Sequence, residues 1–193
     1  MESTSAPVPE RFVEALESIR AADLPREVDL EEIPAPTRAA PYAVALEARI
    51  GGDEEDAESA SGSLVVLHEP GGHLVWDGDF RIVTVAKADL ELELGDDPFL
   101  AEVIWSYLAE AVDLESLRGS ELAGTVTRTV SESFGALRDR GLRVGVEVRA
   151  SWTPDGPGVG QDLAAWLRFL ARLGGVELLP PGVAALRPHS SDA

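Results

Sequence analysis

Apolar side chains recur along this chain with two different spacings, which divide it into helices and strands. In three segments the apolar residues return every three or four positions, as on the buried side of an amphipathic helix. The predicted helices cover residues 12–19, 99–111 and 163–173. Asp97 and Pro98 supply an N-cap and a first-turn residue for the second helix, and Gln161 or Asp162 opens the third.

Five further segments alternate apolar and polar residues or are rich in β-branched residues, as strands are. They cover residues 42–50, 64–67, 81–90, 125–130 and 142–152. The order of elements is therefore α-β-β-β-α-β-β-α. An α+β fold, with an antiparallel sheet of about five strands and helices on one face, satisfies all of these spacings.

The segments between these elements predict the bounds of the domain. Four prolines between residues 23 and 41 exclude a continuous helix and predict an extended segment laid over the fold, anchored by Leu30 and Ile33. Five acids among small residues predict a mobile acidic loop at 51–63. The ends, residues 1–8 and 189–193, are predicted to be disordered, so residues 9–188 form a single domain.

The composition excludes several classes of function. The 193 residues are 45% hydrophobic and 26% charged, as in a globular domain, and contain no cysteine. A disulfide, a thiolate metal site and a cysteine nucleophile are therefore excluded. The N-terminal segment lacks an apolar signal region and no apolar run reaches transmembrane length, so we expect a cytoplasmic protein.

The charge is strongly one-sided, with 16 basic and 35 acidic residues and a formal net charge of −19. Such a field repels nucleic-acid phosphates and anionic membranes, so we expect direct contact with neither. It attracts a basic or amphipathic protein partner, although it also keeps a protein soluble.

One cluster of candidate ligands lies around a glycine-rich connection. His68, Glu69, His73 and Asp77 combine imidazole and carboxylate groups, the usual donors for a divalent metal. Their spacing fits no standard metal motif, and Pro70-Gly71-Gly72 precludes the helix that a metalloprotease motif needs. We therefore expect exposed turn residues and no metal or cofactor, and keep a small-molecule, metal-binding or hydrolytic site as the alternative.

The segment Trp76-Asp77-Gly78-Asp79 predicts a turn in which Gly78 supplies a positive φ angle. Trp76 is then expected to anchor the core, because buried aromatic residues are common. In a functional interpretation Trp76 lines a ligand cleft beside Asp77.

Charged residues alternate along the last two predicted strands. Arg128, Glu132, Arg143, Glu147 and Arg149 are expected to form cross-strand ion pairs on one sheet face. If that face lines a groove instead, guanidinium groups such as those of Arg128 and Arg149 are the best ligands for an anion.

Two other motifs are weak. The loop Gly156-Pro157-Gly158-Val159-Gly160 precedes a helix but lacks the spacing of a phosphate-binding loop, so we interpret it as a connection. Ser131 and Ser133 lack the preceding glycine of a nucleophile elbow.

Several phrases of the sequence resemble an uncharacterised actinobacterial family, domain of unknown function 3000. The resemblance runs from about Phe12 to Pro188 and brings no activity, cofactor or catalytic residue with it. The phrases are Leu30-Glu31-Glu32-Ile33-Pro34-Ala35-Pro36, Ala40-Pro41-Tyr42-Ala43, Trp76-Asp77-Gly78, Ser131-Glu132-Ser133-Phe134-Gly135, Arg149-Ala150-Ser151-Trp152-Thr153-Pro154 and Pro180-Pro181-Gly182-Val183-Ala184-Ala185-Leu186.

The order of elements also looks like that of the type III secretion chaperone fold, whose members are small, acidic and usually dimeric binders of extended peptide. This likeness is an analogy at the level of the fold. Our leading hypothesis is a non-enzymatic protein-binding or chaperone-like adaptor that uses an exposed apolar surface or a sheet edge, and a homodimer is compatible with it.

Overall fold

The computed structural model describes residues 7–51, 59–115, 120–176 and 178. The predicted disordered ends and the predicted acidic loop lie mostly or wholly outside the described residues.

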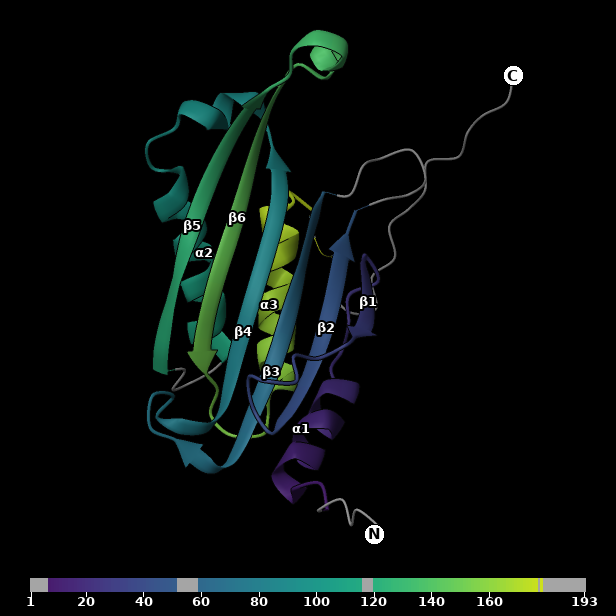
Figure 1. Cartoon of the computed structure of the whole chain (residues 1–193), viewed down its shortest axis with the longest axis vertical. Helices are drawn as coiled ribbons and strands as arrows, with labels where there is room; N and C mark the ends of the chain where they lie inside the picture. Colours follow the sequence, from purple (N-terminus) through teal and green to yellow (C-terminus); the bar gives the residue numbers. More distant parts are fainter. Residues whose placement is uncertain (1–6, 52–58, 116–119, 177, 179–193) are drawn as a thin grey trace, which may run out of the picture.

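The centre of the molecule is one six-stranded antiparallel sheet (Figure 1). Its strands lie in the order β1-β2-β3-β4-β6-β5. Their bounds are β1 (Val28–Ile33), β2 (Tyr42–Ile50), β3 (Ala60–His73), β4 (Gly78–Leu90), β5 (Ser120–Glu132) and β6 (Leu142–Thr153). The predicted antiparallel α+β fold is confirmed.

The prediction of about five strands missed β1. This strand pairs with β2 from Val28 opposite Ile50 to Ile33 opposite Ala45. Pro25 and Pro34 flank the strand and none lies inside it, so each of its residues has a backbone N–H. The proline-rich composition of the whole segment concealed a short stretch that is free of proline.

Three α-helices accompany the sheet, namely α1 (Glu10–Arg20), α2 (Leu100–Glu115) and α3 (Gly160–Leu173). Two short 3₁₀ helices, η1 (Leu92–Asp96) and η2 (Gly135–Arg140), lie before α2 and at the turn between β5 and β6. As predicted, the carboxylate of Asp97 lies at the start of α2, where it accepts a hydrogen bond of 2.8 Å from the Phe99 N–H.

The helices α2 and α3 pack against each other behind the sheet, on what we call the helical face (Figure 1). Even-numbered strand residues such as Val66, Ile82 and Val148 point to this face and are fully buried. Trp166 and Leu170 of α3 complete the same core. The period-two alternation of the strands therefore selects one buried face, as the sequence predicts.

Figure 1 looks onto the opposite face, which we call the open face, where α2 and α3 do not lie. The connection between β1 and β2 crosses in front of β2 and β3 there, and Ala45 and Leu67 on this face are buried. The rest of the open face carries mainly polar side chains.

The helix α1 closes one end of the sheet by packing against the start of α3. The Gly160 N–H donates a hydrogen bond of 2.9 Å to the hydroxyl of Ser18. A side chain at Gly160 would collide with the Ser18 carbonyl oxygen, so this contact requires glycine. The glycine-rich loop before α3 therefore serves helix packing.

Candidate functional site

The predicted histidine and carboxylate cluster does not come together. His68 points to the helical face and is 1% exposed, whereas the next residue, Glu69, is only partly covered. His73 and Asp77 lie exposed in the turn that joins β3 to β4. Within the described ranges, no group of three or more His, Asp or Glu residues is placed to hold a metal ion.

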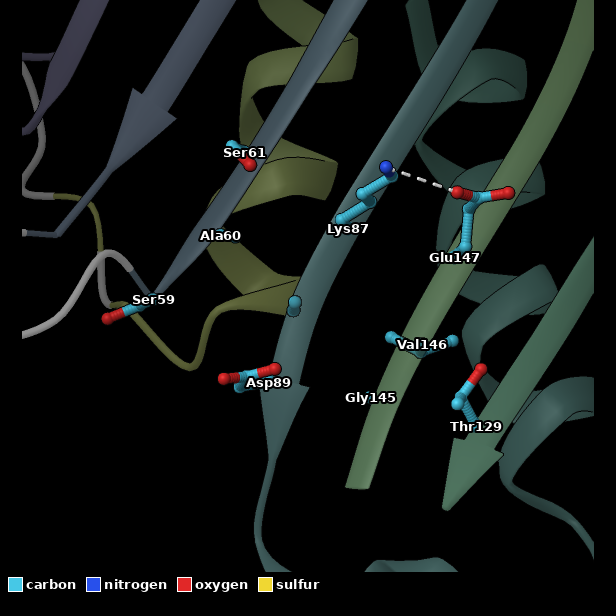
Figure 2. Close-up of a pocket in the computed structure, with 10 residues that line it drawn as sticks. Ser59, Ala60, Ser61, Lys87, Asp89, Thr129, Gly145, Val146 and Glu147 are labelled. Atoms are coloured by element: carbon cyan, nitrogen blue, oxygen red, sulfur yellow. Dashed lines mark ion pairs between the residues drawn. The ribbon is translucent and has the colours of Figure 1, made fainter. Parts of the chain in front are cut away.

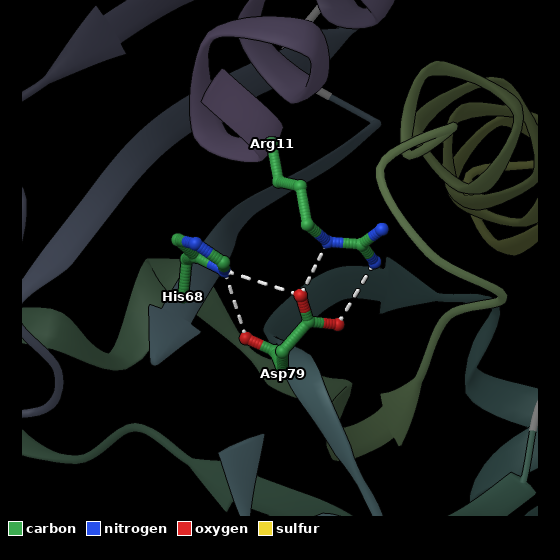
Figure 3. A network of polar contacts seen from close by, with 3 residues as sticks. All are labelled: Arg11, His68 and Asp79. Carbon is green, nitrogen blue, oxygen red and sulfur yellow. Dashed lines mark hydrogen bonds and ion pairs between the residues drawn. The ribbon is translucent and has the colours of Figure 1, made fainter. Parts of the chain in front are cut away.

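His68 is instead part of the packing between α1, β3 and β4 (Figure 3). Its Nδ1 donates to the carbonyl oxygen of Asp79 over 2.9 Å, while its Nε2 is buried without a partner. The ring stacks on Phe80 at a centroid distance of 4.3 Å and on Phe12 at 5.9 Å. These contacts give His68 a structural place between two aromatic rings.

The carboxylate of Asp79 joins this network to α1 (Figure 3). Its two oxygens accept hydrogen bonds of 2.6 and 3.1 Å from the guanidinium group of Arg11. The hydrogen bond with Asp79 raises the pKa of Arg11. Arg11 could not be singled out from the sequence, because nothing in its spacing shows that α1 lies over this strand.

The turn between β3 and β4 carries the two large apolar side chains with the highest exposed fractions in the described chain. We call residues 73–77 the hairpin tip. Leu74 is 102% exposed and Val75 is 79% exposed. Beside them the rings of His73 and Trp76 stack at a centroid distance of 4.5 Å. Two apolar residues inside a turn, between Gly72 and Asp77, were the signal that sequence reasoning overlooked.

Two predictions about this turn were wrong. Trp76 does not anchor the core: it is half-buried at the tip, where it packs against His73. The positive φ angle belongs to Asp77, at 55°, because Gly78 already pairs with His73 as the first residue of β4. Asp77 tolerates this conformation better than most residues.

Arg128 and Arg149 lie on opposite faces of the sheet, so the predicted row of charges on one face was wrong. Arg128 points to the helical face and donates to the Asp97 carbonyl oxygen over 2.7 Å. Arg149 points to the open face and donates to the Glu147 carboxylate over 2.6 Å. Because Thr125 pairs with Arg149, the odd-numbered residues of β5 share the face of Arg149, and Arg128 lies on the other face. The sequence alone does not give this pairing.

On the open face lies a depression of about 350 Å³, lined in part by Lys87, Asp89 and Glu147 (Figure 2). Lys87 lies 3.3 Å from the Glu147 carboxylate, and Arg143 pairs with Asp89. The hydrogen bond from Arg149, followed by that from Lys87, lowers the pKa of Glu147. Since these charged groups bind one another, the depression offers a ligand little that is not already engaged.

A further arginine, Arg81, stabilises the start of β5. Its guanidinium donates to the hydroxyls of Ser151 and Thr153 over 2.7 and 3.0 Å and to the Glu121 carbonyl oxygen over 3.1 Å. Burial lowers the pKa of Arg81. Glu121 has a positive φ of 61° where the β5 register shifts, so Arg81 satisfies a carbonyl group at an irregular point of the sheet.

These features define a class of protein. The chain is an α+β protein with one open antiparallel sheet and helices on one face. None of the described helices has the length and apolar character needed to span a membrane.

The chain belongs to the family described as protein of unknown function DUF3000, whose sequence model matches residues 8–184. This match confirms the family predicted from the sequence. No curated protein and no solved structure matches the chain.

Proposed function

We propose that this chain is a non-enzymatic protein-binding module and that the hairpin tip is a contact surface. The observation that carries the proposal is the exposure of Leu74 and Val75, two neighbouring aliphatic side chains that are almost fully in water. Exposed apolar groups that lie together mark interaction sites more often than apolar residues scattered singly. Burying these two side chains in a partner removes their whole apolar surface from water.

The hairpin tip is held in place before any partner arrives. The Trp76 N–H donates to the His73 carbonyl oxygen over 3.0 Å, and the two rings stack. The Thr153 hydroxyl of β6 donates to the Trp76 carbonyl oxygen. A surface that is already ordered loses less conformational entropy on binding, and this favours affinity.

The charge of the molecule supports a protein as the partner. A net charge of −19 disfavours nucleic acid and anionic lipid and favours proteins with basic surfaces. We further propose that the protein acts in the cytoplasm. A chaperone-like role would consist of holding a partner segment in extended form.

Substitution of the tip tests this proposal. In Leu74→Ser/Val75→Ser the fold should be unchanged, because both side chains are exposed, while a partner isolated with the wild-type chain should bind at least about tenfold more weakly. Binding is measured by calorimetry with the purified partner, and melting temperatures check the fold.

Leu24→Ser is the matched control, because Leu24 is also an exposed leucine but lies outside the tip. It should bind like the wild-type chain. Equal affinity of the double variant and the control would refute the hairpin tip as a contact surface.

A further inference from the structure

A second exposed apolar surface lies at the other end of β4. Four residues form it, and we call them the η1–α2 patch: Leu92, Phe99, Val103 and Val130. Phe99 is 64% exposed, and Val103 follows it by one helical turn on the same side of α2. The strand β4 runs from Gly78, next to the hairpin tip, to Leu90, just before η1. The two surfaces are therefore separated by the length of this strand (Figure 1).

Contacts with β5 hold the parts of the patch together. Gly95 of η1 faces Val130 and Val144, with the side chain of Val130 3.9 Å from the position of a Cβ atom on Gly95. The guanidinium group of Arg128 donates to the Asp97 carbonyl oxygen over 2.7 Å, just before Phe99. The start of α2 is thereby fixed beside the end of β5.

The charge around this patch is mainly negative, although Arg128 lies beside the start of α2. Between Lys87 and Arg118 the chain contains nine acidic residues and neither lysine nor arginine. The side chains of four of them are exposed and border the patch in sequence, namely Glu91, Glu93, Asp96 and Glu102. An apolar surface with a negative border is complementary to a segment that is apolar on one side and cationic around it.

We propose that the η1–α2 patch binds a cationic amphipathic segment of a partner protein, with its apolar side chains on Phe99 and Val103 and its Lys or Arg side chains beside the acids. Such segments are recognised by burying apolar anchors in a surface of opposite charge. A second copy of this chain fits poorly, because it would place the same acids against one another. This surface is separate from the hairpin tip, so an experiment can refute binding at one surface without refuting binding at the other.

Model peptides test the proposal with the full chain. The probe is an amphipathic peptide of leucine and lysine, and fluorescence anisotropy at two salt concentrations measures its binding. The wild-type chain should bind it, whereas a leucine and glutamate peptide and a serine and lysine peptide should not bind measurably. Equal binding of the serine and lysine peptide would overturn the proposal, because charge alone would then explain the interaction.

Two variants locate the binding surface. Phe99→Ser/Val103→Ser should weaken binding of the leucine and lysine peptide by at least about tenfold. Glu91→Gln/Glu93→Gln/Glu102→Gln should weaken it and flatten its salt dependence. Leu74→Ser/Val75→Ser should bind the peptide as the wild-type chain does, which separates this surface from the hairpin tip.

Fold and self-association are checked in the same experiment. Melting temperatures show whether each variant is folded, and Val103→Ala alone gives a milder truncation of the patch if the double variant is not. Unchanged affinity in the folded patch variants overturns the proposal. A dimer in sedimentation that disappears in Phe99→Ser/Val103→Ser also overturns it, because the occupant would then be a second copy.

Discussion

At the scale of single residues, the clearest buried polar contact joins β6 to α3. The indole N–H of Trp152 donates to the Asp162 carboxylate over 2.7 Å, and both side chains are buried. Asp162 is the third residue of α3, where a negative charge also interacts favourably with the helix dipole. One carboxylate therefore satisfies a buried donor and stabilises the start of a helix.

Removing this carboxylate should destabilise the fold. In Asp162→Ala the Trp152 N–H loses its acceptor, which costs about 1–3 kcal/mol of unfolding free energy. Asp162→Asn keeps an acceptor oxygen and should lose less. Urea unfolding, followed by tryptophan fluorescence, measures the unfolding free energy of both variants. If Asp162→Ala is as stable as the wild-type chain, the hydrogen bond contributes nothing to stability.

Residue types alone predicted the chemistry of several side chains but not their surroundings. His68 has the side chain of a metal ligand, yet its place on the helical face puts it between Phe12 and Phe80. Trp76 has the side chain of a core residue, yet it lies in a turn beyond the last paired residues of the sheet. In both cases the role depends on how close the side chain lies to the helices. The spacing of residues along the sequence does not reveal that distance.

At the scale of elements, strands extend well beyond the segments that the sequence marks. The apolar run Leu64 to Leu67 became the strand Ala60–His73, although Ser61, Gly62 and Ser63 are weak strand formers. Pairing with β2 and β4 on both sides supplies their hydrogen bonds. Tertiary pairing thus overrides local propensity.

The packing of α2 on β5 depends on a glycine in the strand. A Cβ atom at Gly124 would collide with the Arg149 carbonyl oxygen and would lie 2.9 Å from the Trp105 ring. Gly124→Ala should therefore cost about 1–3 kcal/mol through overpacking. Gly71→Ala is the control, because a Cβ atom there meets nothing within 4 Å, and its stability should stay close to that of the wild-type chain.

Thermal unfolding of the two alanine variants measures the difference. If Gly124→Ala melts at the same temperature as Gly71→Ala, then α2 adjusts its position at no cost and the close approach of Trp105 to β5 is not needed.

At the scale of the whole molecule, negative charge is unevenly distributed. Nine of the 35 acidic residues fall between Lys87 and Arg118 without a basic residue among them. On the open face, by contrast, Lys87 and Arg149 pair with Glu147. Of the acids in that stretch, Asp89 pairs with Arg143 and Glu110 with Arg172, and the remaining negative charge contributes to the repulsion that opposes folding.

Salt should stabilise this protein. Between about 0.01 and 0.1 M ionic strength the Debye length falls from about 30 to about 10 Å, which screens repulsion between acids across the surface. We expect the melting temperature to rise over this range with both sodium chloride and choline chloride. A fall with both salts would mean that ion pairs such as Arg11 with Asp79 outweigh the repulsion.

The sequence by itself determined the period of each element, the antiparallel α+β class, the family and the acidic field, because these depend on neighbouring residues or on sums over the chain. Only the tertiary structure decided which strands lie side by side, which face the helices cover, and where His68, Arg128 and Arg149 point. Those features depend on contacts between residues far apart in sequence. The exposed hairpin tip and the η1–α2 patch belong to the second group, since an apolar residue is exposed only where the fold leaves it without a neighbour.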